Sequence, residues 1–135
     1  MKYINKTMIV AINKLSAKYA GGTIASDTNI RDGQSLSFTE HIFYNSLFGE
    51  VLYPDIFHQA AAYMFYIIKN HIFMDGNKRT GLASAITFLK LNNIIFAAFD
   101  EDIVFDYVID VAQGPNDTEK VIPEIASWLK SMCLY

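Results

Sequence analysis

The densest group of reactive side chains lies in residues 70–81, which read NHIFMDGNKRTG. Its histidine, His71, carries an imidazole that can take a proton from a hydroxyl near neutral pH. Four residues later, Asp75 offers a carboxylate, and a carboxylate beside phosphate oxygens commonly holds Mg²⁺. These two residue types at this spacing indicate a base and a metal ligand at one site.

The residues that follow Asp75 are suited to bind an anion. Gly76 and Asn77 stand where the next helix is expected to begin, and the first turn of a helix has backbone N–H groups without internal partners. Gly76 permits a positive φ and a close approach of a ligand to the backbone. Lys78 and Arg79 add two full positive charges. Together these residues predict a phosphate site.

A base, a metal carboxylate and a phosphate cradle in so short a segment suit the transfer of a phosphorus group to a hydroxyl. Lys69, just before His71, is expected to add charge at the mouth of the same loop. Other interpretations stay open. His71 could be a helix cap or a surface group, and Asp75 could be only the N-cap of the following helix. Lys69, Lys78 and Arg79 could be solvated surface cations.

Two apolar segments flank this loop and must position it. Their periodicity predicts helices from about residue 54 to 69 and from 76 or 77 to about 92. The first is apolar on most of its faces, which is typical of a buried helix. In the second, an apolar stripe is expected at Leu82, Ala85, Ile86, Phe88, Leu89 and Leu91. The loop therefore lies between two central helices that are predicted to be buried, and Phe73 is expected to point inward and anchor it.

The rest of the chain contains four more predicted helices and no convincing sheet. Apolar residues at helical spacing, with turn residues between them, place these helices at Lys6–Tyr19, Ser35–Leu47, Glu101–Gln113 and Glu119–Met132. A short extended piece, IIFAAF, precedes the third of them. Roughly six helices in 135 residues predict a single all-α domain, a compact bundle over residues 1–135.

The charge and composition argue against several classes of protein. The net charge is −3 without a run of Lys or Arg, which argues against nucleic acid as a direct partner. No stretch of about 18 uncharged apolar residues occurs, so no membrane partner is expected. The apolar stretch Met8–Ile12 is too short for a signal peptide and Cys133 is the single cysteine, so we expect a cytoplasmic protein. The 52% hydrophobic share leaves room for an apolar surface that binds a partner.

The motif also resembles a known signature. His71-x-Phe73-x-Asp75-Gly76-Asn77-Lys78-Arg79 resembles the signature of the Fic/Doc family, and of its Doc (death-on-curing) branch in particular. Typical Fic enzymes carry glycine at the position of Lys78 and a second arginine at that of Leu82. Both departures resemble Doc-type toxins, and the flanking stretches TNIRDG, YPDIFHQAAAY and FLKLNN fit as well.

The resemblance implies a Fic/Doc-like fold and the toxin of a toxin–antitoxin module. It implies transfer of the γ-phosphate of ATP to a threonine of elongation factor Tu, which arrests translation, with ATP and Mg²⁺ as cofactors. By motif position, His71 would be the base and Asp75 the Mg²⁺ ligand. The phosphate holders would be Asn77, Lys78 and Arg79. It also implies an antitoxin whose disordered tail folds into an apolar groove of the toxin.

Three other functions remain open. AMP transfer to a protein hydroxyl, the usual Fic reaction, is the nearest, and Lys78 and Leu82 argue against it. A catalytically idle binding module is the second, and the intact His71 and Asp75 argue against it. A metal-dependent nuclease is the most distant, because these two side chains are too few metal ligands and the chain is acidic.

Overall fold

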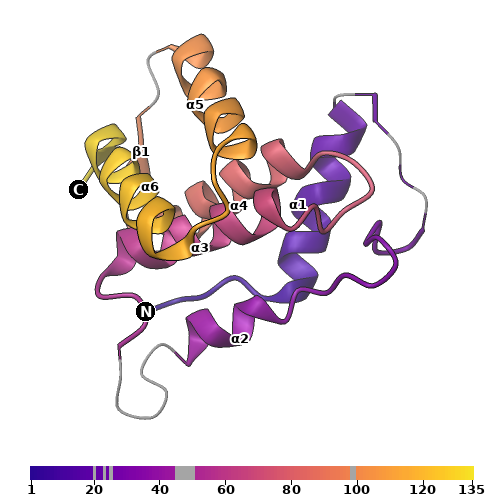
Figure 1. The fold of residues 1–135 in the computed structure, drawn as a ribbon, viewed down its shortest axis with the longest axis horizontal. Helices are drawn as coiled ribbons and strands as arrows, with labels where there is room; N and C mark the ends of the chain where they lie inside the picture. The colour runs from indigo at the N-terminus through magenta and orange to yellow at the C-terminus, as the bar shows by residue number, and fades with distance from the viewer. Residues whose placement is uncertain (20, 23, 25, 45–50, 98–99) are drawn as a thin grey trace.

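The structure is a computed structural model that describes residues 1–19, 21–22, 24, 26–44, 51–97 and 100–135 (Figure 1). Over these residues the chain forms six helices and one two-stranded sheet: α1 (Lys6–Tyr19), α2 (Phe38–Phe43), α3 (Ile56–Lys69), α4 (Asn77–Leu91), β1 (Ile95–Phe96), α5 (Glu101–Gln113), α6 (Thr118–Met132) and β2 (Cys133–Leu134). The prediction of an all-α fold with about six helices is confirmed. Within the described ranges, no helix has both the length and the apolar character needed to cross a membrane.

Helix α3 forms the centre of the fold and packs against α4 and α6 (Figure 1). Most of its residues are buried, as expected for a helix that is apolar on most faces. Its contact with α4 is close because Gly81 has no side chain: a Cβ there would lie 2.7 Å from Ile68 Cγ1 and 3.0 Å from the Met64 carbonyl oxygen. The Asp55 carboxylate caps its start by accepting a hydrogen bond from His58 N at 2.9 Å. Helix α3 is thus a buried support that ends at the reactive loop.

Helix α4 is less buried than predicted. Its buried residues are Thr80, Gly81, Ser84, Ala85, Phe88 and Leu89. Within the predicted stripe, Leu82, Ile86 and Leu91 are only partly buried, and Leu82 and Leu91 still pack against the core. Periodicity locates an apolar face without showing how much of it another element covers. Here the flank with Leu82 and Ile86 borders a groove that α4 shares with α1 and α5.

Strands β1 and β2 form a small sheet that was not predicted from the sequence. Strand β1 pairs antiparallel with β2, with Ile95 opposite Leu134. Strands of two residues carry no periodic signal, so pairing between such distant segments could not be predicted. The extended piece that was predicted there continued into residues 98–99, which lie outside the described residues.

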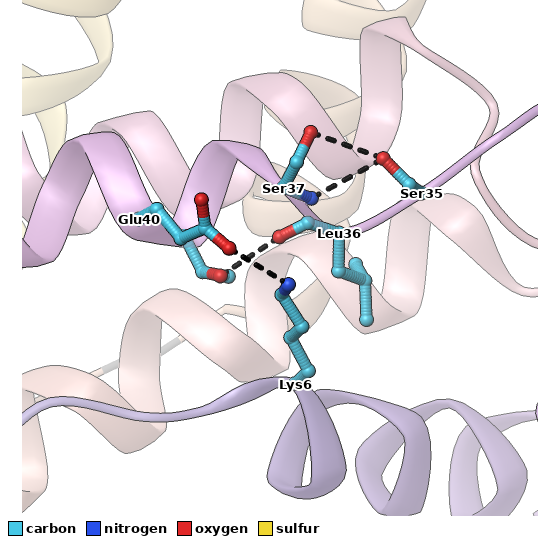
Figure 2. Close-up of polar contacts among 6 residues, drawn as sticks. Lys6, Ser35, Leu36, Ser37 and Glu40 are labelled. Carbon is cyan, nitrogen blue, oxygen red and sulfur yellow. Dashed lines mark hydrogen bonds and ion pairs between the residues drawn. The ribbon is translucent and has the colours of Figure 1, made fainter.

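Helix α2 is shorter than predicted. The expected helix began at Ser35 and ran into residues 45–50, which lie outside the described residues. Before the helix, the Ser35 hydroxyl donates a hydrogen bond to Ser37 Oγ at 3.0 Å (Figure 2). An ion pair of 3.0 Å between Lys6 Nζ and Glu40 Oε1 links the start of α1 to α2 (Figure 2). Both of these side chains are exposed, so the pair contributes little to stability.

Candidate active site

The reactive loop, residues 70–76, joins α3 to α4 and is clamped by the first residue of α4. Asn77 Oδ1 accepts a hydrogen bond from Phe73 N at 2.9 Å, and Asn77 Nδ2 donates one to Phe73 O at 2.9 Å. The Phe73 side chain is fully buried, which confirms that it points inward. The centre of the loop is therefore held through both its backbone and its side chain.

The segment between α1 and α2 also holds the reactive loop in place. Ile30 pairs with Phe73 in an isolated antiparallel β-bridge. Beside this bridge, Arg31 N donates a hydrogen bond to Ile72 O at 2.8 Å. The Arg31 guanidinium also donates to His71 O at 3.3 Å. The segment between α1 and α2 thus fixes the backbone on which His71 stands.

Gly76 starts α4 with a left-handed backbone conformation, φ 77°. It is the N-cap residue and, as a glycine, has no side chain that could make a capping hydrogen bond. The first-turn N–H groups of α4 are therefore suited to an anion. Asp75 Oδ1 accepts a hydrogen bond from Gly76 N at 2.8 Å. The interpretation of Asp75 as the N-cap of α4 is wrong, because that position belongs to Gly76.

Five of the predicted site residues line one small pocket of about 130 Å³. They are His71, Asp75, Gly76, Asn77 and Lys78. The opposite wall includes Ala112 of α5. His71 has φ 47° and an exposed side chain, so its ring stands at the open side of the loop. Ligand sites for whole small molecules usually exceed about 300 Å³, so this pocket suits a phosphate group and the rest of a nucleotide would extend beyond it.

Lys69 lies at the end of α3 but does not line this pocket. Its ammonium group donates hydrogen bonds to Ala112 O at 3.1 Å and Gly114 O at 2.6 Å. These carbonyls belong to the end of α5, where a cation also interacts favourably with the helix dipole. Lys69 therefore ties α5 to the end of α3, and its assignment as a phosphate ligand stays a prediction.

Arg79 lies at the boundary between the loop and a larger groove. Its guanidinium carbon is 5.5 Å from the centre of the Phe105 ring, a cation–π contact with α5. The groove, of about 460 Å³, runs between α1, α4 and α5. Its apolar lining includes Ile12, Leu15, Tyr19, Leu82, Ile86 and Phe105. Arg79 is therefore not among the residues that line the small pocket, and its phosphate-binding role stays a prediction.

A sequence model described as the Fic/DOC family matches residues 3–89, well over half of the chain. The chain belongs to the Fic/DOC family. The match contains the whole reactive loop, its clamp and most of α4.

Two members named Doc are similar to this Fic/DOC chain. The Toxin Doc of Mycolicibacterium smegmatis is 37% identical over 84 residues, which are 62% of this chain and 65% of that protein. The Protein kinase doc of Escherichia phage P1 is 28% identical over 122 residues, which are 90% of each chain. The alignments therefore span slightly less than two thirds of the first relative and nine tenths of the second.

Asp75 supplies a carboxylate to the lining of the small pocket, and its role as a Mg²⁺ ligand stays a prediction. Gly22 lies directly against this carboxylate, since a Cβ at that position would be 2.5 Å from Asp75 Oδ2. Gly22 also ends α1, because its N–H donates to Ala17 O at 2.7 Å. One carboxylate with phosphate oxygens and water is a ligand set that Mg²⁺ prefers. Asp75 is therefore the residue that would hold Mg²⁺ beside a bound phosphate.

Three residues that support the Fic/DOC loop were missed in the sequence. Neither Gly22 nor Arg31 was singled out as a site residue, although Arg31 lies in the TNIRDG stretch that fits the resemblance. Asn13 is fully buried under the loop, between Ile9 and Ala17 on the inner face of α1. Asn13 could have been noticed in the sequence, because it is a polar residue on the apolar face of a predicted helix, and buried polar groups need hydrogen-bond partners.

Proposed function

We propose that this protein is the toxin of a toxin–antitoxin module and transfers the γ-phosphate of ATP to a protein hydroxyl. The observation that carries the proposal is that His71, Asp75 and Lys78 line one pocket at the start of α4. The names of the relatives, a Toxin Doc and a Protein kinase doc, support both parts of it. The proposed acceptor is a threonine of elongation factor Tu, and its phosphorylation would arrest translation in the cytoplasm.

In the proposed reaction, the acceptor hydroxyl oxygen attacks the γ-phosphorus of ATP, the bond to the β–γ bridging oxygen breaks, and ADP leaves. His71 accepts the hydroxyl proton as the new P–O bond forms. The N–H groups at the start of α4, with Lys78 and Arg79, bind the phosphate oxygens, over which negative charge is spread. Asp75 would hold Mg²⁺, which when bound neutralises part of that charge.

Lys78 favours phosphate transfer over AMP transfer. A glycine at this position would let a phosphate approach the backbone, whereas the lysine stem fills that space and offers a cation instead. Lys78 is exposed and lines the pocket, so its ammonium can meet the phosphate from outside. Leu82, at the position of the second arginine of typical Fic enzymes, borders the apolar groove and supplies no charge. AMP transfer is the outcome that would overturn this part of the proposal.

The groove between α1, α4 and α5 is the proposed binding site of the antitoxin. Leu15 and Tyr19 of α1 have 59% and 88% of their surface exposed, respectively, at one wall of the groove. Leu82 and Ile86 of α4 are partly uncovered at its floor. A disordered tail that folds into an amphipathic helix needs such an apolar stripe. Arg79 lies in the same groove, so a bound tail would lie against a proposed phosphate ligand.

Growth arrest in bacteria tests the toxin function. We expect the wild-type protein, expressed without antitoxin, to arrest growth and translation, and His71→Ala to have no effect. His41→Ala is the matched control, because His41 is an exposed histidine on α2 and lies outside the pocket. Arrest by His71→Ala at equal protein level would contradict catalysis at this loop. Harmless wild-type protein would contradict the toxin function itself.

A further inference from the structure

Asn13 is a buried polar residue that the proposed reaction does not use directly. It lies on the inner face of α1, one turn from Ile9 and one turn from Ala17, and none of its surface is exposed. Burying a side-chain amide is unfavourable unless hydrogen bonds replace the lost water. An apolar residue at this position would avoid that cost. The role of Asn13 is therefore to be found in the hydrogen bonds of its side chain.

The Asn13 amide joins three parts of the chain beneath the reactive loop. Its Nδ2 donates hydrogen bonds to Asp75 O at 2.8 Å and to Thr80 Oγ1 at 3.0 Å. Its Oδ1 accepts one from Asn29 Nδ2 at 3.0 Å. Thr80 and Asn29 are also fully buried. One side chain of α1 therefore connects the reactive loop, the first turn of α4 and the segment between α1 and α2.

The bond to Asp75 O fixes the peptide between Asp75 and Gly76. In a trans peptide the carbonyl and the N–H point in opposite directions. Because Asn13 draws the Asp75 carbonyl inward, the Gly76 N–H points away from the core, where it donates to Asp75 Oδ1 at 2.8 Å. The same amide lies under Gly76, since a Cβ there would be 3.4 Å from Asn13 Nδ2. Asn13 is thus connected through one peptide unit to the carboxylate at the pocket.

We propose that Asn13 is a positioning residue for the phosphate and metal site, acting through the orientation of the Asp75–Gly76 peptide. Without its amide, this peptide is free to rotate, and both the Gly76 N–H and the Asp75 carboxylate lose their direction. The inference rests on the proposed function in one respect, namely that the pocket binds the phosphates and Mg²⁺ of a nucleotide. The orientation of the loop itself is a property of the unliganded protein and does not depend on that function.

The test compares Asn13→Ser with Tyr63→Phe. The serine variant removes both donated hydrogen bonds and leaves a polar space that water can enter. Tyr63→Phe is the matched control, because it removes a buried side-chain bond to a main-chain carbonyl, Tyr63 Oη to Ile4 O at 3.0 Å, outside the pocket. Three quantities are measured for each: the melting temperature, the hydrogen–deuterium exchange of a peptide spanning the loop, and the γ-phosphate transfer rate against Mg²⁺ concentration.

We expect Asn13→Ser to speed exchange in the unliganded loop by about tenfold. Its transfer rate should fall by about ten- to a hundredfold, with a higher Mg²⁺ requirement. Tyr63→Phe should lower the melting temperature but leave loop exchange and transfer as in the wild type. Unchanged exchange, or faster exchange with unchanged transfer, would overturn the proposal. If the wild type itself transfers no phosphate, the proposed function fails. The hydrogen–deuterium exchange of the loop then decides alone whether Asn13 orients it.

Thr80→Val provides a second variant if Asn13→Ser does not fold. It removes one acceptor of the Asn13 amide and leaves the bond to Asp75 O in place. We expect transfer within about threefold of the wild type, because the orientation of the peptide is kept. A large loss of transfer at an unchanged melting temperature would contradict the proposal that Asn13 acts through its hydrogen bond to Asp75 O.

Discussion

The Asn77 side chain and the Phe73 backbone exchange two hydrogen bonds of 2.9 Å, which close the reactive loop onto the first turn of α4. The same two-point pattern occurs at the far end of α4, where Asn92 Oδ1 accepts from Lys2 N at 2.9 Å and Asn92 Nδ2 donates to Lys2 O at 2.8 Å. The C-cap residue of α4 therefore makes a similar clamp away from the site, and its Nδ2 also donates to Phe88 O at 2.9 Å.

This pair of clamps gives the first prediction. Asn77→Ala should lower the free energy of unfolding by about 2 kcal/mol, since two hydrogen bonds are lost, and should reduce phosphate transfer by about a hundredfold because the loop is no longer held. Asn92→Ala loses three hydrogen bonds, so it should be destabilised at least as much, but it should keep its transfer rate. Urea unfolding and labelled-phosphate transfer measure the two effects. Equal loss of transfer in both variants would mean that Asn77 acts only through stability.

The second prediction concerns the contact between Gly22 and Asp75. Gly22→Ala should raise the Mg²⁺ concentration for half-maximal transfer by about tenfold, because the added Cβ displaces the carboxylate. The backbone φ of Gly22 is not in the left-handed region, so alanine causes no backbone strain there, and its effect comes from the contact with Asp75. Gly21→Asn is the control: its φ of 68° suits asparagine, and a Cβ there meets no atom within 4 Å. An unchanged Mg²⁺ requirement in Gly22→Ala would argue against Asp75 as the metal ligand.

The third prediction concerns the groove. Ile86→Asp should weaken binding of the cognate antitoxin, because it places a charge on the apolar floor, while leaving growth arrest intact. Ile103→Asp on the exposed face of α5 is the matched control, since Ile103 lies outside the groove. The measurement is growth rescue by co-expressed antitoxin. Full rescue of Ile86→Asp would place the antitoxin elsewhere on the toxin.

The fourth prediction concerns the cap of α3. Partial burial raises the pKa of Asp55, but the hydrogen bonds and charge of His58 outweigh this and hold the pKa below its usual value. A carboxyl whose pKa is lower in the folded state contributes stability above its unfolded pKa of about 4, and loses it as the pH falls through the folded value. At pH 7, Asp55→Ala should lower the free energy of unfolding by about 1 kcal/mol.

The variant Asp55→Asn distinguishes the effect of the capping hydrogen bond from the effect of the carboxylate charge. Asparagine is also a good N-cap, so this variant keeps the capping bond and loses the charged contact with the His58 ring, 2.9 Å away. The difference in unfolding free energy between wild type and Asp55→Asn should shrink as the pH falls below about 4. A difference that is constant from pH 7 to pH 3 would show that the charge of Asp55 contributes nothing.

The elements that could be predicted are those specified by local sequence. Helices α1 and α5 begin and end where the apolar spacing and the turn residues place them. The loop residues His71, Asp75 and Lys78 lie together because a short segment between two helices cannot spread them apart. Phe73 points inward as predicted, and like its neighbour Ile72 it is fully buried.

What could not be predicted depends on contacts between distant segments. The network of Asn13, Asn29 and Thr80 joins residues from three parts of the chain, and no periodic pattern reports such pairs. The position of the Lys69 ammonium likewise depends on where α5 ends in space. For Leu82 and Ile86, the pattern identified an apolar flank correctly but could not show that the groove leaves it partly uncovered.

The most direct test of the central claim is the source of the transferred group. Antitoxin-free protein is incubated with Mg²⁺, elongation factor Tu and ATP labelled on either the γ- or the α-phosphate, with His71→Ala in parallel. We predict that label reaches the factor only from the γ position, and only with the wild-type protein. Label from the α position would show AMP transfer and contradict the role given to Lys78. Absence of transfer from both positions, to the factor and to a bacterial lysate, would contradict an enzyme at this loop.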